Sequence, residues 1–146
     1  MLAAPMAARA GAADATPVGT WLTERGGADV KIASCGGKLC GSIVWLKEPL
    51  NAHGQPKVDS KNPDESLRSR KILGVPLLTD FVRSGDGSNV WQDGLIYNPD
   101  DGKTYKCTLT LVDDHTLRVR GYVGISLLGK TQTWTRVDGT APAVSR

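Results

Sequence analysis

The segment Cys35-Gly-Gly-Lys-Leu-Cys-Gly-Ser-Ile-Val-Trp-Leu46 places two cysteines on either side of a four-residue loop that contains two glycines. A loop of this length and glycine content is typical of a β-hairpin, and it would bring Cys35 and Cys40 within disulfide reach. Disulfides persist in oxidising compartments. The segment therefore predicts a disulfide-clamped hairpin in an exported β-protein, but it identifies no reaction.

Working outward from this hairpin, runs of alternating apolar and polar residues are separated by Gly, Asn and Asp turns from Pro17 onward, which indicates an antiparallel all-β domain. The predicted strands are 18–23, 29–34, 39–47, 77–83, 89–97, 103–111, 116–123 and 131–137. Short turns between neighbours favour an eight-stranded up-and-down barrel over a sandwich. Such a barrel has room inside for packed side chains or for one small ligand.

The connection between the third and fourth predicted strands, residues 48–76, is too long for a plain hairpin loop and is expected to carry function or to act as a lid. Within it, Asn62-Pro63-Asp64-Glu65 offers an N-cap, a proline at the first helical position and acidic residues in the first turn. These signals predict one short helix, which Gly74 and Pro76 would end.

Length and charge restrict the class of protein. The 146 residues suit a single domain, predicted over 16–138 with a flexible tail at 139–146, and the formal net charge of +3 is mild. No run approaches the roughly 18 apolar residues of a membrane-spanning helix. The absence of a long Lys/Arg block disfavours nucleic acid as a partner.

Residues 1–15 are rich in alanine and end in Ala13-Asp14-Ala15, which is similar to a signal-peptide cleavage site. A basic n-region is missing, so two interpretations stay open: the remnant of a signal peptide and a disordered tail. Together with the predicted disulfide, the first interpretation indicates an exported protein.

The third cysteine, Cys107, shares the apolar face of its strand with Tyr105, Leu109 and Leu111, so a buried thiol is expected rather than a reactive one. Cys35 and Cys40 lack a second Cys/His pair that could complete a zinc tetrahedron. We predict no metal site and no cofactor.

Gly19-Thr20-Trp21 in the first strand resembles the G-x-W signature of the calycin superfamily, which contains the lipocalins and fatty-acid-binding proteins. In the last strand, Arg136 stands where that superfamily packs a basic side chain across the tryptophan. The resemblance implies a barrel-closing Trp21–Arg136 pair, worth about 1 kcal/mol.

An ordered set of motifs along about nine-tenths of the chain resembles a bacterial family of small exported proteins known only as a domain of unknown function. The motifs are Cys35–Leu46, Asp59-x-x-Asn62-Pro63, Leu67-Arg68-x-Arg70, Gly74, Trp91-x-x-Gly94-x-Ile96-Tyr97-x-Pro99, Gly102-Lys103-x-Tyr105, Arg120–Gly124 and Leu128-Gly129 to Trp134. The resemblance implies a lipocalin-like barrel in a periplasmic or secreted bacterial protein, with no agreed activity.

The sequence favours non-catalytic binding of a small apolar or amphipathic molecule, with an anionic head group as one possibility. The expected interior residues are Val30, Ile32, Ile43, Trp45, Leu95, Tyr97, Tyr105, Leu109, Leu117 and Val119. The candidate ligand-binding residues are Trp45, Asp59, Asn62, Arg68, Arg70, Tyr97 and Tyr105. Arg68 or Arg70 could pair with a carboxylate or phosphate. The alternative is a structural role, in which Asp59 and Asn62 cap the helix and the arginines pair with Asp64 or with the barrel rim.

Two other functions remain open: an interaction module with a solid barrel that docks on an envelope protein, and an enzyme of unassigned class. His53 and His115 stand in loops without a nucleophile at a recognisable spacing, so no catalytic residue is predicted. Neither G-x-S-x-G nor H-E-x-x-H occurs in the sequence.

Overall fold

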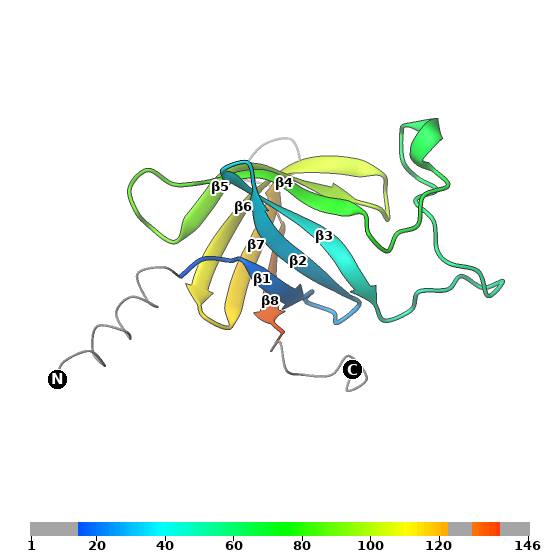
Figure 1. The fold of residues 1–146 in the computed structure, drawn as a ribbon, viewed down its shortest axis with the longest axis horizontal. Coiled ribbons are helices and arrows are strands. Elements are labelled where there is room, and N and C mark those ends of the chain that lie inside the picture. Colours follow the sequence, from blue (N-terminus) through cyan, green and yellow to red (C-terminus); the bar gives the residue numbers. More distant parts are fainter. Residues whose placement is uncertain (1–14, 123–129, 138–146) are drawn as a thin grey trace.

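Eight antiparallel strands form a closed barrel in the computed structural model, which describes residues 15–122 and 130–137 (Figure 1). Each strand pairs with its neighbours in sequence, and β8 pairs with β1. The strands are β1 (Gly19–Leu22), β2 (Ala28–Cys35), β3 (Lys38–Leu46), β4 (Pro76–Arg83), β5 (Val90–Asn98), β6 (Lys103–Asp113), β7 (Thr116–Tyr122) and β8 (Lys130–Arg136). The predicted up-and-down barrel is confirmed.

Strand bounds agree with the sequence-based prediction to within two residues wherever both are described. The predicted leader at 1–15 falls outside the described residues up to position 14, as do Val123 at the end of the seventh predicted strand and the C-terminal tail. Within the described ranges, no helix is long and apolar enough to cross a membrane.

The β2–β3 hairpin is clamped by the predicted disulfide between Cys35 and Cys40, whose Cα atoms lie 5.9 Å apart. The turn is tighter than the four residues expected, because Cys35 pairs directly with Lys38 and only Gly36 and Gly37 remain between the strands. Both glycines have positive φ, 62° and 87°. Two-residue hairpin turns of this kind require that conformation, which explains the glycine pair.

One end of the barrel is closed by Arg136, whose guanidinium lies 4.3 Å from the centroid of the Trp21 ring. Its Nη1 donates to the carbonyl of Val18 at 2.8 Å, and its Nε donates to the carbonyl of Asp114 at 2.5 Å. A Cβ on Gly19 would stand 2.5 Å from Nη1. The glycine of the G-x-W motif therefore makes room for the arginine that joins β8 to β1.

The core fills the barrel from this closed end, with Trp21, Phe81 and Trp91 among its largest buried side chains. Six of the predicted interior residues are buried there: Val30, Ile32, Ile43, Leu109, Leu117 and Val119. The prediction for Leu95 was wrong, since it is 37% exposed.

A bulge in β5 explains the error at Leu95. The β5–β6 register shifts between Trp91 and Gly94, so these two residues both face inward although they are three positions apart. Asp93 lies within this bulge and adopts a positive φ of 63°. A one-residue shift moves every later side chain to the opposite face, and Leu95 therefore points outward while Ile96 points inward.

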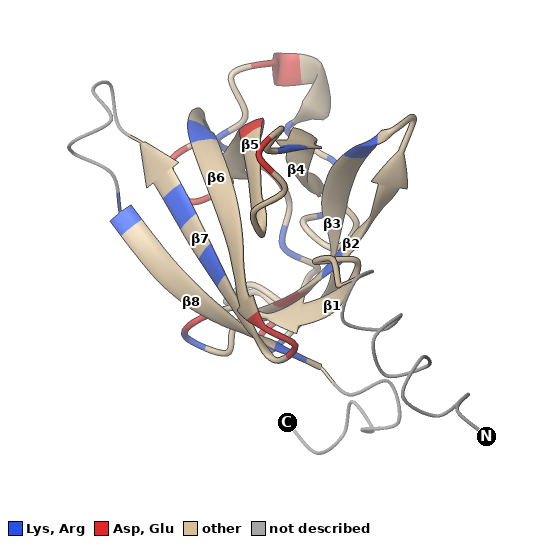
Figure 2. Ribbon diagram, turned by 90° about the vertical axis from the view of Figure 1, so that its left-hand side faces the viewer, with Lys and Arg blue, Asp and Glu red and all other residues tan. Residues whose placement is uncertain are grey.

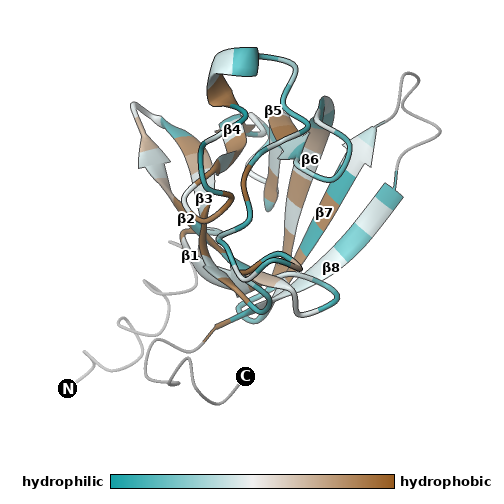
Figure 3. Cartoon of the chain, turned by 90° about the vertical axis from the view of Figure 1, so that its right-hand side faces the viewer, coloured by the Kyte–Doolittle hydropathy of each residue, from teal (hydrophilic) through white to brown (hydrophobic). Residues whose placement is uncertain are grey.

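Residues 47–75 connect β3 to β4 across the other end of the barrel, which is turned toward the viewer in Figure 3. The predicted short helix is a single 3-10 turn, η1 (Glu65–Leu67). Its N-cap is Asp64, which accepts from the amide of Ser66, and not Asn62. The Asn62 side chain instead donates to Asp59.

Candidate functional site

A cavity of about 340 Å³ opens at the end of the barrel opposite Arg136. Here β1, β3, β5 and β7 end and β2, β4, β6 and β8 begin. The lining residues are Thr23, Leu77, Ile96, Tyr97, Asn98, Pro99, Asp100, Asp101, Tyr105, Val119, Gly121, Lys130, Gln132 and Trp134. The interior is thus packed solid on one side and hollow on the other.

The floor of the cavity is apolar. Leu77, Val119 and Trp134 are buried beneath it, and Ile96 contributes a partly buried side chain. Gly121 leaves space above Val119 on the same inward face of β7, because a Cβ there would meet its nearest atom only at 3.7 Å. The alternation of β7 and β8 therefore builds both the floor and the empty volume.

Its rim is polar. The Tyr105 hydroxyl donates to Oδ2 of Asp101, and the backbone amide of Lys103 donates to the other carboxylate oxygen at 2.8 Å. The hydrogen bond from Tyr105 lowers the pKa of Asp101, and the same bond raises the pKa of Tyr105. Both shifts move away from neutrality, so near pH 7 Asp101 is ionised and Tyr105 is protonated.

Lys130 is the one basic side chain among the described residues that line the cavity. Figure 2 shows further bands of Lys and Arg along β6 and β7. Arg118 and Arg120 alternate with the buried Leu117 and Val119, which places them on the outer face. Lys130 therefore shares the mouth with two acidic lining residues, Asp100 and Asp101.

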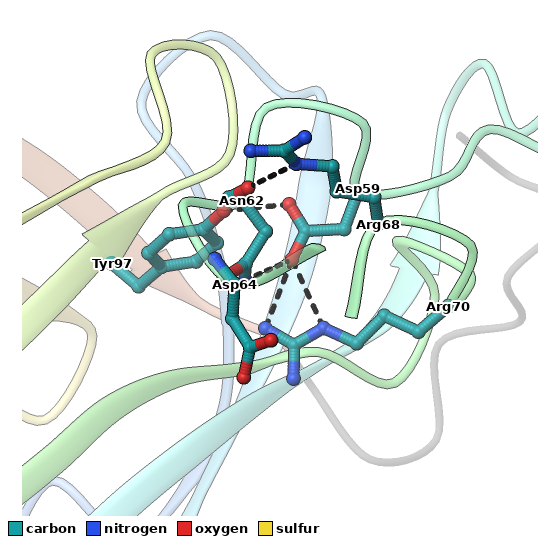
Figure 4. A network of polar contacts seen from close by, with 6 residues as sticks. All are labelled: Asp59, Asn62, Asp64, Arg68, Arg70 and Tyr97. Carbon is teal, nitrogen blue, oxygen red and sulfur yellow. Dashed lines mark hydrogen bonds and ion pairs between the residues drawn. The ribbon is translucent and has the colours of Figure 1, made fainter. Parts of the chain in front are cut away.

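A second polar cluster lies in the long loop around Asp59, which is fully buried (Figure 4). The Tyr97 hydroxyl donates to Oδ1 of Asp59 at 2.6 Å. Oδ2 accepts from Asn62 Nδ2 at 2.9 Å, from Arg70 Nε at 3.0 Å and from Arg70 Nη2 at 2.9 Å. We call these four residues the Asp59 clip. It fastens the loop to β5.

The clip is satisfied by its own members. Burial alone raises the pKa of Asp59, but the hydrogen bonds from Tyr97, Asn62 and Arg70 together bring that pKa below its usual value. Burial and the bond to Asp59 raise the pKa of Tyr97 to about 12. Hydrogen bonds from several donors to one charged carboxylate are strong and hold the loop to β5. The hydrogen-bonding groups of the Asp59 clip face one another rather than the cavity.

The structure divides the candidate ligand-binding residues into separate groups. Tyr97 and Tyr105 line the cavity, and Tyr97 also belongs to the Asp59 clip. Arg68 is exposed on the loop, where its Nε donates to the carbonyl of Asn62 at 2.6 Å. Trp45, half-buried near the end of β3, is not a lining residue.

Sequence reasoning missed Lys130, Gln132 and Trp134 of the cavity wall. A signal for them was present, because they alternate with the exposed threonines of β8 and therefore share one face. Cys107, by contrast, is a free buried thiol as expected, and burial raises its pKa to about 12. Among the described residues, no group of three or more His, Cys, Asp or Glu side chains could hold a metal ion.

Comparison with known families gives one match: a bacterial family described as "Uncharacterized protein conserved in bacteria (DUF2147)" aligns with residues 19–136. No curated protein matches the chain. Among solved structures, protein HP1028 from Helicobacter pylori, described as belonging to the lipocalin family, is similar at 27% identity. The match has a TM-score of 0.71 and covers 84% of this chain and 83% of that one.

Proposed function

The chain belongs to the DUF2147 family of uncharacterised bacterial proteins, and on that premise we propose that its barrel binds a small amphipathic molecule as a carrier or sensor, without catalysis. The observation that carries this proposal is the cavity of about 340 Å³ at the open end, with an apolar floor and a polar rim. Its volume is near the lower end of the range for small-molecule sites.

The apolar part of the ligand would lie on Leu77, Val119 and Trp134, where contact removes hydrocarbon from water. The head group would meet Lys130 and Gln132, which follow the floor residue Trp134 toward the mouth along β8. An anionic head group would bind on the Lys130 side of the mouth, away from Asp100 and the ionised Asp101 of the β5–β6 turn, because Arg70 is occupied by the buried Asp59 and Arg68 stands outside the cavity.

Absence of catalysis is supported by the state of the titratable rim. A general acid or base works best with a pKa near the operating pH. Asp101 and Tyr105 are instead shifted away from neutrality by their mutual hydrogen bond. Export of the protein to the periplasm or beyond is part of the proposal and rests on the disulfide between Cys35 and Cys40.

Mass spectrometry of the protein purified from the envelope of its own bacterium tests whether the cavity arrives occupied. The intact protein is measured under native conditions and again after organic extraction. A stoichiometric amphiphile that is released by extraction would support the proposal. A protein that is empty, and that also binds no fatty acid or other anionic amphiphile added in titration, would refute it.

Variants then locate the ligand through the change in tryptophan fluorescence on titration with a fatty acid, since Trp134 lies at the cavity floor. Gly121→Leu adds a large side chain at the cavity, where a Cβ would make only ordinary contact at 3.7 Å from Ile96, and should abolish binding. Lys130→Gln should weaken binding of the acid about tenfold but leave binding of the matching alcohol unchanged. Arg68→Ala is the matched control for loss of a basic side chain outside the cavity and should have no effect.

A further inference from the structure

The long loop between β3 and β4 contains three short antiparallel segments, around residues 49–51, 55–59 and 70–73. Leu50 lies opposite Pro56, and Val58 lies opposite Lys71. Backbone hydrogen bonds join the segments, including Asn51 N to Gln55 O at 2.7 Å, Asp59 N to Arg70 O at 2.9 Å and Ile72 N to Lys57 O at 2.9 Å. Extended segments paired in this way have two faces, and residues opposite one another share a face.

One face of these segments is turned toward the barrel. Asp59 is buried in its clip with Tyr97 of β5, Arg70 binds Asp59, and Ile72 packs against the hydrophobic core. Lys57, on the same side, is partly buried and lies 4.0 Å from Glu48. The loop is therefore held to the barrel through its inner face.

The other face points away from the barrel and is mostly apolar. It consists of Leu50, Pro56, Val58, Lys71 and Leu73, and we call it the outer loop face. Leu50 is 52% exposed, Val58 is 40% exposed and Leu73 is 48% exposed. In Figure 3, which looks at the loop from outside, hydrophobic stretches interrupt the hydrophilic ones along it. Exposed aliphatic side chains gathered on one face indicate a contact surface.

We propose that the outer loop face docks on the surface of an anionic lipid bilayer. Charge supports this partner: apart from the Asp59–Arg70 pair, residues 47–75 carry five basic side chains and three acidic ones, a surplus of two positive charges. Lys71 lies on the outer loop face itself. Aliphatic residues that enter the headgroup region beside lysines that meet anionic lipids are the pattern of interfacial membrane binding.

The composition and size of the outer loop face favour lipid over protein. Protein interfaces are enriched in Tyr, Trp and Arg and need roughly 20–30 residues on each side. The outer loop face has five residues, none of which is aromatic or arginine. Its position at the open end of the barrel would bring the cavity mouth near the bilayer. The proposal does not depend on the ligand, since no residue of the face lines the cavity.

Vesicle flotation of the full chain tests the proposal. The vesicles are phosphatidylcholine alone or a mixture containing phosphatidylglycerol, at low and at high salt. The wild type should float with the anionic vesicles and dissociate at high salt. Leu50→Gln, Val58→Thr and Leu73→Gln combined should reduce its partitioning at least tenfold. Lys71→Gln should reduce it about fivefold, the equivalent of about 1 kcal/mol for one basic residue, and on anionic vesicles only.

Matched controls separate this face from general hydrophobicity and charge. Val44, Val82 and Val112 are exposed to 45%, 39% and 46% on other parts of the barrel, so the combined change Val44→Gln, Val82→Thr and Val112→Gln makes the same kinds of substitution elsewhere and should leave binding unchanged. Lys38→Gln at the disulfide hairpin is the control for Lys71→Gln. Circular dichroism verifies that each variant folds.

Three results would overturn the proposal. The first is a wild-type protein that stays in the bottom fraction of the gradient with both kinds of vesicle. The second is equal loss of flotation in the loop variant and its valine control. The third is a dimer, seen by analytical ultracentrifugation without vesicles, that the loop variant disrupts, because that result would assign the face to a second copy of the chain. A negative flotation result would not affect the proposal that the cavity binds a ligand. A cavity found empty would likewise not affect the proposal of bilayer docking, which flotation tests separately.

Discussion

Tyr97→Phe removes one oxygen from the Asp59 clip and leaves the ring of Tyr97 in place. The Tyr97 hydroxyl donates to the fully buried Asp59 at 2.6 Å, and the bond joins β5 to the long loop. Hydrogen bonds to charged groups contribute about 1.5–3 kcal/mol. Asn62 and Arg70 donate to Oδ2, so the variant leaves Oδ1 of this buried carboxylate without the Tyr97 donor. We therefore expect a loss near the upper end, about 2–3 kcal/mol.

Urea denaturation at neutral pH measures this change, and Tyr122→Phe is the matched control. The Tyr122 hydroxyl lies 3.5 Å from the uncharged Thr108 hydroxyl, so its removal should cost less than about 0.5 kcal/mol. Amide hydrogen exchange should also show faster opening of residues 56–72 in Tyr97→Phe. If the two phenylalanine variants had the same stability and the same loop protection, the clip would contribute nothing measurable and the reasoning would be refuted.

Acid adds a second test of the same bond. The pKa of Asp59 is lower in the folded protein than its ordinary value of 3.8, so its ionised form stabilises the fold at pH values above 3.8. That contribution disappears as the pH falls through the folded pKa. The stability difference between wild type and Tyr97→Phe should therefore be constant from pH 5 to 7 and shrink below about pH 4. A difference that grew on acidification would contradict the assignment.

Three further changes test the packing of the barrel. Gly94→Ala places a Cβ 2.4 Å from the ring of the buried Phe81, and thermal denaturation should show a loss of about 1–3 kcal/mol that Phe81→Leu partly restores; an unchanged melting temperature would contradict the close approach. Gly102→Ala puts a Cβ against the backbone of the long loop at a residue with φ 71°, so protease cleavage in that loop should accelerate, whereas the wild-type rate would argue against this contact. Replacing Cys35 and Cys40 by Ser should cost about 2 kcal/mol in urea denaturation and match the effect of reductant on the wild type; a stabilised variant would show the clamp to be dispensable.

The position of the cavity was harder to predict than the strands. Asp59, Asn62 and Arg70 were selected because polar loop residues beside a barrel mouth often bind ligands. The structure instead directs their side chains at one another and at Tyr97. A pattern in the sequence shows which residues are polar, but it does not show whether a carboxylate and a guanidinium eleven positions apart will meet.

The fold could be predicted from features that involve only a few neighbouring residues. Alternation with period two, turn residues and the glycines between Cys35 and Cys40 act over a few residues, so the eight strands, their order and the disulfide hairpin could be predicted from the sequence alone. The closing pair of Trp21 and Arg136 was expected from resemblance, and the structure stacks the two side chains.

Closure of the barrel determined two features that the alternation of apolar and polar residues did not predict. The bulge at Asp93 depends on packing Phe81 against Gly94 from the neighbouring strand, and it reversed the face of Leu95. The cavity likewise exists only because β1, β4, β5, β6, β7 and β8 bring residues far apart in sequence to one end. The sequence by itself determined the strands and their turns, because those depend on neighbours along the chain. Tertiary structure alone determined which polar side chains bind one another and which line the cavity or the outer loop face, because that depends on neighbours in space.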